Sequence, residues 1–286
     1  MSRLPLLAAL LAAVALMLVS PPLQAEAAVS SACVVATGDA NACSTTIIMG
    51  HRCRDWGTDN AHTNENTVAA LRYVAENSPG AGCEIDIWRL HDGGIVVQHD
   101  PTWTRTIDPA TMVGVSPNVV DATSAQVARM RTKGGQPVPT LQQMIVASGQ
   151  NHVPLLIETK NYTVDPSWVT FARQQGVTAW WYHSPSPTHA CWTVMLDRIR
   201  PTGAVVGMKG TRSCDYLSPA QVRQQGTFLV TNVQTWTKAQ VQTYRNLGVM
   251  LSPYLVQPEG LANIVSKGAR MVIVPDTAVA AAWFGR

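Results

Sequence analysis

Three carboxylates and an ammonium group occupy two apolar stretches of this 286-residue sequence at strand spacing. Glu84 and Asp86 lie two residues apart in CEIDIW, and Glu158 and Lys160 lie two apart in LLIETK. Side chains two apart on a strand share a face. Buried carboxylates need a cation or a charged partner, and ligand sets made only of oxygen favour Mg²⁺ or Ca²⁺ over Zn²⁺. The sequence therefore predicts a site for Ca²⁺ or Mg²⁺, with pairing to Arg or Lys as the alternative.

Two histidines and an arginine end neighbouring strand-like runs. His51 and Arg52 close IIMGHR, and His99 lies near the end of GIVVQHD. A divalent cation with fixed arginine and lysine side chains could offset the charge of a phosphate and its transition state. Two imidazoles could divide proton transfer near neutral pH, one as base and one as acid. This combination of groups indicates phosphodiester hydrolysis.

Strand-like runs alternate with helical patterns along the chain, which predicts repeated βα units and a parallel sheet. The expected strands cover 45–51, 83–88, 94–100, 153–160, 178–184, 204–210, 227–233, 249–256 and 269–276. The expected helices cover 64–78, 140–149, 165–176, 189–200, 218–226, 237–248 and 259–268, with Asn64, Asp165, Ser218 and Thr237 as capping residues. Residues 101–139 have weak periodicity and are expected to form an excursion over one end of the barrel.

Nine strands are one too many for an eight-stranded barrel, and a hairpin resolves the conflict. Asp-Gly at 92–93, between two β-rich runs, predicts a two-residue turn. That turn would set His99 opposite Asp86, and a turn shifted by one residue would set it opposite Trp88. Either register leaves His99 on the carboxylate face. The expected fold is therefore an α/β (β/α)₈ TIM barrel with a β-hairpin extension after the second strand.

The first 27 residues have the basic start, apolar run and small-residue exit of a secretory signal peptide. A retained anchor helix is the alternative. Residues 28–286 are expected to form a single catalytic domain that is secreted, with cleavage near Ala27 and no stable membrane insertion. The net charge of +3, without runs of Lys or Arg, excludes nucleic acid as an expected partner.

All six cysteines follow the signal segment, and an even number in an oxidising compartment favours disulfides. Fifteen pairings of six cysteines are possible. Short separation favours Cys33–Cys43 and Cys191–Cys214, which would leave Cys53 with Cys83.

A series of short motifs resembles the glycerophosphodiester phosphodiesterase family. The motifs are GHR at 50–52, NENT at 64–67, EID at 84–86, DGG at 92–94, VVQHD at 96–100 and IETK at 157–160. Their order and spacing carry the resemblance, over residues 47–160. It implies a (β/α)₈ barrel, a bound Ca²⁺ or Mg²⁺, and hydrolysis of glycerophosphodiesters to glycerol 3-phosphate and an alcohol.

The resemblance also implies roles for individual residues. It makes His51 and His99 the acid and base, in an order that stays open, and Arg52 and Lys160 phosphate contacts. It makes the three carboxylates of the two strands, Glu84, Asp86 and Glu158, the metal ligands.

The sequence departs from the family's pattern in ways that bear on the substrate. Cys53 stands at the usual glycine after His-Arg, and LSPYLV and VIVPD replace the family's late strand motifs. The aromatic run at 180–182 could line the pocket and hold a choline head group by cation–π attraction, or pack as core. The alternatives are a sphingomyelinase D-like phospholipase acting on lysophospholipids and a non-catalytic secreted binding protein on the same barrel. The alcohol and the oligomeric state stay open.

Overall fold

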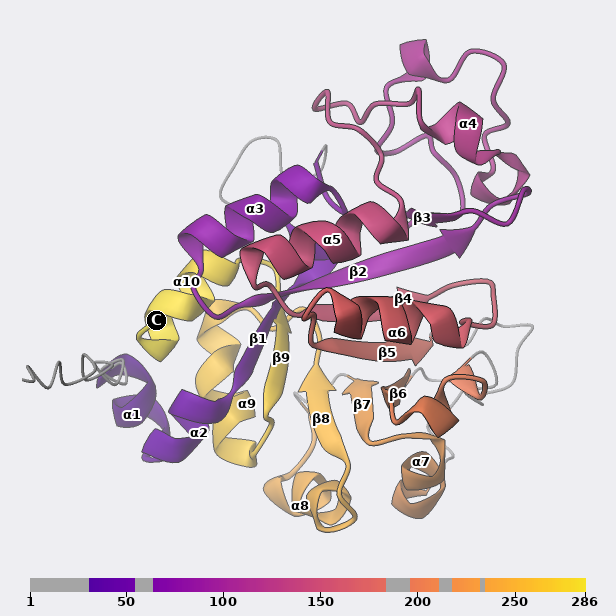
Figure 1. Cartoon of the computed structure of the whole chain (residues 1–286). Helices are drawn as coiled ribbons and strands as arrows, with labels where there is room; N and C mark the ends of the chain where they lie inside the picture. Colours follow the sequence, from indigo (N-terminus) through magenta and orange to yellow (C-terminus); the bar gives the residue numbers. More distant parts are fainter. Residues whose placement is uncertain (1–30, 55–63, 184–195, 211–217, 232–234) are drawn as a thin grey trace, which may run out of the picture.

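The computed structural model describes residues 31–54, 64–183, 196–210, 218–231 and 235–286 (Figure 1). Within them the chain forms nine strands, at the positions that the sequence predicts. They are β1 (Ile47–Gly50), β2 (Gly82–Arg89), β3 (Ile95–Val97), β4 (Leu155–Thr159), β5 (Ala179–His183), β6 (Val205–Lys209), β7 (Phe228–Thr231), β8 (Met250–Pro253) and β9 (Met271–Val274).

Eight of these strands run parallel in the order β8-β7-β6-β5-β4-β2-β1-β9. The two end strands approach each other, and the Val256 amide, just beyond β8, donates to the Ile273 carbonyl of β9 at 3.0 Å. The result is a nearly closed barrel, so the predicted (β/α)₈ fold is confirmed. In such a barrel the carboxyl ends of all eight strands meet at one mouth, which is where βα loops gather functional side chains.

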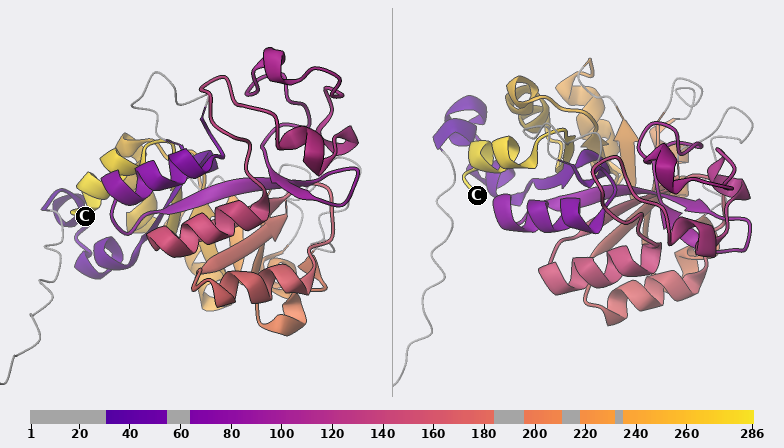
Figure 2. Two further views of the ribbon diagram at one scale, coloured as in Figure 1. Left: turned by 45° about the horizontal axis from the view of Figure 1, so that its top comes forward. Right: turned by 90° about the horizontal axis from the view of Figure 1, so that it is seen from above.

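Helices surround the barrel, and most begin and end near the predicted positions (Figure 2). They are α3 (Val68–Asn77), α5 (Leu141–Asn151), α6 (Pro166–Gln174), α7 (Pro219–Gln225), α8 (Lys238–Asn246), α9 (Leu261–Lys267) and α10 (Thr277–Phe284), preceded by α1 (Ser31–Thr37) and α2 (Ala40–Thr45). The predicted caps Asp165, Ser218 and Thr237 are confirmed. Asn64 is wrong as the cap of α3, because Thr67 accepts from the Ala70 amide there. The helix expected over 189–200 lies largely outside the described residues.

Alternating side chains on the strands divide the core in two. Cys83, Ile85 and Ile87 of β2 face outward and pack with the covering helices. A smaller apolar cluster fills the barrel interior and includes Met49 and Phe228. This alternation sends Glu84 and Asp86 inward, as the spacing predicts.

The hairpin after β2 is confirmed, but its predicted register is wrong. β3 pairs antiparallel with β2 through Ile87 and Val97, so Gln98 lies opposite Asp86 and not His99. The turn has three residues, 91–93, and ends with Gly93 at φ 87°, a common arrangement in hairpins. Continued as a strand, this register would turn His99 away from the carboxylates. β3 ends at Val97, however, and the chain leaves the ladder there.

Residues 101–139 form the expected excursion, which lies beyond the end of β2 (Figure 1). They share a separate apolar cluster with Leu90 and Val96 of the hairpin. Trp103, Ile107, Val119 and Met130 are fully buried in it. The last residues of the excursion lie against β3, where the Val97 amide donates to the Pro139 carbonyl at 2.9 Å. The excursion therefore packs as a unit against the hairpin.

Two of the three expected disulfides are present, Cys33–Cys43 and Cys53–Cys83. Cys191 and Cys214 lie outside the described residues, as does the expected signal segment. Among the described helices, none has the length and apolar character needed to cross a membrane.

We predict that Trp103→Ala loosens the excursion without unfolding the barrel. Truncation of a buried tryptophan typically costs about 3–5 kcal/mol, and here the loss falls on the separate cluster around Trp103. Amide hydrogen exchange should become faster across residues 101–139 and stay unchanged in β4 to β6.

Trp103→Phe is the matched control. It keeps an aromatic ring and removes an indole N–H that has no hydrogen-bond partner among the described residues, so its effect should be much smaller. Cooperative unfolding of the whole protein by Trp103→Ala would show that the excursion is not an independent unit.

Candidate functional site

Three buried carboxylates meet inside the barrel mouth. Glu84 and Asp86 come from β2 and Glu158 from β4, and the register of these strands sets Asp86 beside Glu158. One oxygen from each lies within 4.8 Å of the others, and each residue is only 1% exposed. An oxygen-only donor set of this size fits a hard divalent cation such as Ca²⁺ or Mg²⁺.

The carboxylates differ in their affinity for protons. Burial, together with the charges of Asp86 and Glu158, raises the pKa of Glu84 to about 8. Burial also acts to raise the pKa of Asp86 and of Glu158. The Lys160 ammonium, together with the Asn66 donor at Asp86 and the Lys209 ammonium at Glu158, contributes to an opposing effect that leaves both pKa values below the ordinary range. Without a cation, one proton therefore stays on the cluster at neutral pH.

Two lysines supply positive charge to the cluster. The Lys160 Nζ lies 2.8 Å from Asp86 Oδ1 and 2.5 Å from Glu158 Oε1. The Lys209 Nζ, from β6, lies 3.3 Å from Glu158 Oε2. Lys160 lies on the same side as Glu158, as the spacing of two residues predicts. Its ammonium contacts the carboxylates themselves, so it belongs to the acidic part of the site.

Tyr182 joins two of the acids, a role that the sequence did not reveal. Its Oη lies 2.7 Å from both Glu84 Oε1 and Glu158 Oε2. A phenol has one proton to donate, so the second contact needs a proton on a carboxyl group, in agreement with the raised pKa of Glu84. Of the three aromatics at 180–182, Trp181 packs with the outer helices and Trp180 with the barrel interior.

His51 and Arg52 lie in a turn at the carboxyl end of β1. Arg52 has left-handed backbone angles, φ 57° and ψ 28°, and its amide donates to Glu84 Oε2 at 2.8 Å. Its carbonyl accepts from the Asn66 amide at 2.7 Å. Burial, aided by the charge of Arg52, lowers the pKa of His51 to about 3, so its imidazole is neutral at neutral pH.

His99 reaches the same place from the other side of β2. Its Nε2 lies 3.0 Å from the Arg52 Nη2, and its Nδ1 lies 2.6 Å from Asp100 Oδ1. A guanidinium can only donate, so Nε2 accepts and Nδ1 carries the proton that Asp100 receives. Arg105 holds Asp100 in turn, with Nε 2.5 Å from Oδ2.

Glu65 is a second residue that the sequence did not identify as part of the site. It is buried and contacts three guanidinium groups, those of Arg52, Arg54 and Arg105, at 3.3, 3.5 and 2.5 Å. Its neighbour Asn66 donates from Nδ2 to Asp86 Oδ2 at 3.0 Å. Both belong to the NENT motif, whose position in the sequence was the available clue.

The structure thus gathers all seven predicted residues at one end of the barrel: His51, Arg52, Glu84, Asp86, His99, Glu158 and Lys160. Arg52 connects the acidic cluster with the surrounding residues, since its backbone binds Glu84 while its guanidinium binds His99 and Glu65. The arrangement can hold a cation, bind an anion beside it and transfer protons.

Comparison with known proteins gives the chemical context. A model of the glycerophosphoryl diester phosphodiesterase family matches residues 54–177. No match was found among curated proteins. Among solved structures, a glycerophosphodiester phosphodiesterase from Agrobacterium tumefaciens is similar at 21% identity and TM-score 0.65, over 83% of this chain and 99% of that one.

Two further structures are similar in the same way. A phosphodiesterase from Oleispira antarctica, solved with the product sn-glycerol-3-phosphate, has 16% identity and TM-score 0.65, over 84% of this chain and 98% of its own. A glycerophosphodiester phosphodiesterase from Thermotoga maritima has 19% identity and TM-score 0.59, over 82% and 96%. At these identities the likeness establishes the fold.

We predict that cation binding strengthens with pH up to about pH 8. The proton on Glu84 must leave when a cation enters, so the apparent dissociation constant for Ca²⁺ or Mg²⁺ should fall about tenfold between pH 6 and pH 7. Titration calorimetry in buffers of different ionisation enthalpy would count the released proton. Glu84→Gln should abolish the pH dependence, and an affinity independent of pH in the wild type would contradict the prediction.

The same proton makes the contribution of Glu84 to the stability of the cation-free protein smaller as the pH rises. The folded state holds it up to about pH 8, whereas the unfolded chain loses it near the ordinary glutamate pKa of 4.5. Because the folded state binds more protons across this interval, the contribution of Glu84 to the free energy of unfolding falls through it.

Proposed function

We propose that this chain, which a model of the glycerophosphoryl diester phosphodiesterase family matches over residues 54–177, hydrolyses glycerophosphodiesters to glycerol 3-phosphate and an alcohol with a divalent cation. The observation that carries this is the position of Arg52, which touches a metal-ligand candidate, a histidine and Glu65 at once. A phosphate bound there would lie beside both the cation and the imidazoles. The Oleispira antarctica structure with sn-glycerol-3-phosphate supports the product class.

In this proposal Glu84, Asp86 and Glu158 hold Ca²⁺ or Mg²⁺. When bound, the cation offsets the negative charge of the phosphate and of its transition state. The Arg52 guanidinium grips phosphate oxygens through its planar fork, and Lys160 adds a second positive charge at the cluster.

His51 and His99 divide the proton transfer, one accepting a proton from the nucleophile and one delivering a proton to the leaving alkoxide. Asp100 keeps the His99 ring oriented by accepting its Nδ1 proton. Burial keeps His51 neutral before substrate binds.

The proposal extends to the whole chain. We infer that residues 28–286 form one catalytic domain after a signal peptide of residues 1–27, and that the protein is secreted. The disulfides Cys33–Cys43 and Cys53–Cys83 are compatible with an oxidising compartment.

We predict metal-dependent release of glycerol 3-phosphate by the purified protein. Turnover should be measured by a coupled assay against glycerophosphodiesters with several alcohols and against lysophospholipids, before and after chelation. Chelation should abolish turnover and added Ca²⁺ or Mg²⁺ should restore it, whereas Asp86→Asn should weaken cation binding. Full activity after exhaustive chelation would refute the proposed function. Hydrolysis of lysophospholipids with no hydrolysis of glycerophosphodiesters would also refute it.

We predict that His51→Ala and His99→Ala each lower the rate about 10²–10⁴-fold while the protein stays folded, the usual size of general acid–base contributions. The double variant should lose less than the product of the single losses, because groups that act together are not additive. Arg52→Lys should weaken binding with both histidines present, because lysine lacks the planar fork.

Turnover and melting temperature should be measured on the same preparations. If His51 only stabilises the strand end, His51→Ala will lower the melting temperature and leave the rate of the folded protein within about tenfold of wild type, which is below the general acid–base range.

A further inference from the structure

Two consecutive residues after β1 have left-handed backbone angles. Arg52 has φ 57° and Cys53 has φ 49°. Residues with a Cβ are disfavoured there, because the side chain approaches the backbone carbonyl, whereas glycine adopts these angles freely. A turn with two such residues in succession needs surrounding contacts to hold it.

A disulfide makes the strongest of these contacts. Gly50, the last residue of β1, pairs with Cys83 in the β1–β2 ladder. The left-handed turn then brings Cys53 back over β2, where it is bonded to Cys83 with the two Cα atoms 4.5 Å apart. Both cysteines are fully buried on the outer face of the strand.

The turn carries groups on which the site depends. The Arg52 amide donates to Glu84, the residue directly after Cys83, and the Arg52 carbonyl accepts from the Asn66 amide. His51 immediately precedes Arg52. A rotation of the turn would therefore move an imidazole, a guanidinium and a carboxylate together.

We propose that the Cys53–Cys83 disulfide is a positioning element of the active site, which holds the left-handed turn so that His51 and Arg52 face the carboxylate cluster. This inference rests on the proposed function for its catalytic readout. Because both sulfur atoms are buried, bulk reductant has little access to the bond in the folded protein. Its role is to fix geometry.

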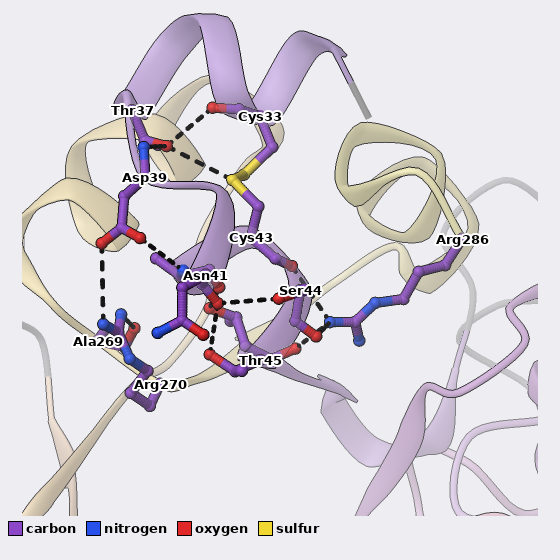
Figure 3. Close-up of a disulfide and its surroundings, with 12 residues drawn as sticks. Cys33, Thr37, Asp39, Asn41, Cys43, Ser44, Thr45, Ala269, Arg270 and Arg286 are labelled. Atoms are coloured by element: carbon purple, nitrogen blue, oxygen red, sulfur yellow. Dashed lines mark hydrogen bonds and ion pairs between the residues drawn. A yellow bond between two sulfur atoms is a disulfide. The ribbon is translucent and has the colours of Figure 1, made fainter. Parts of the chain in front are cut away.

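The chain offers a matched control in Cys33–Cys43, which joins α1 to α2 before the amino end of β1 (Figure 3). The residues around it connect helices and chain ends and include none of the candidate site residues. Arg286 donates to the carbonyls of Ser44 and Thr46, and Asp39 lies near Arg270. Removing this disulfide perturbs the opposite end of the barrel from His51.

The experiment compares three double variants with the wild type: C53A/C83A, C53G/C83A and C33A/C43A. Each is assayed for glycerophosphodiester hydrolysis, melting temperature and amide exchange over residues 51–54. We expect C53A/C83A to lose about 10²-fold in kcat/KM, the size of effect that a displacement of about 1 Å can cause. C53G/C83A should recover to within about tenfold of wild type, because glycine accepts the left-handed angles without the bond.

C33A/C43A should lower the melting temperature and keep the wild-type kcat/KM at temperatures where it is folded. Exchange over residues 51–54 should accelerate at least about tenfold in C53A/C83A and stay unchanged in C33A/C43A.

Equal losses of activity in all three variants would show that the disulfide acts on stability alone and overturn the proposal. Equal losses of kcat/KM in C53A/C83A and C53G/C83A would show that the disulfide does not act by holding the left-handed turn, and would overturn that part of the proposal. If the wild type releases no glycerol 3-phosphate, the proposed function fails, and the exchange data still decide whether the disulfide fixes the turn.

Discussion

Mutual repulsion among Glu84, Asp86 and Glu158 is the constraint on which the structure around the barrel mouth depends. Three buried carboxylates with oxygens within 4.8 Å cannot all remain ionised without compensation. The compensation comes from Lys160, from Lys209, from the phenol of Tyr182 and from the Arg52 and Asn66 N–H donors. These groups arrive from five parts of the chain, and the barrel is what makes their convergence possible. A cation would take over much of this compensation, which is why the cluster fits one.

Beside the carboxylate cluster lies a second group of charged residues, in which arginines surround one carboxylate. Glu65 is a single buried carboxylate with three guanidiniums around it, so this side of the site has an excess of positive charge. Arg52 belongs to both centres, since its amide faces the acids and its guanidinium faces Glu65 and His99. A phosphodiester carries one negative charge and gains more in its transition state, so the boundary between the two centres is the place where such a group is best stabilised. His51 and His99 lie at that boundary.

Backbone geometry connects these electrostatics to the fold. β1 ends beside Cys83, near the start of β2, and the left-handed turn after β1 folds back onto β2 through Cys53 and Cys83. The excursion starts from the hairpin beyond His99, and Arg105, within it, reaches both Asp100 and Glu65. The same excursion that extends the barrel therefore also holds the histidine in place. Glu65 is buried, so loss of its guanidinium partners would leave an unpaired charge in the interior, which is destabilising.

The sequence by itself determined the nine strands, the inward faces of Glu84, Asp86 and Glu158, and the grouping of His51 and Arg52 with them, because strand periodicity and chain order are local properties. It could not determine the hairpin register, since a three-residue and a two-residue turn around Asp92-Gly93 differ by one residue and reverse every face. Nor could it identify Lys209, Glu65 or the contacts of Tyr182 with two of the acids, because these depend on strand register or on arginines elsewhere in the sequence. Only the tertiary structure decided these contacts, where the distances between side chains set the charges that each must balance.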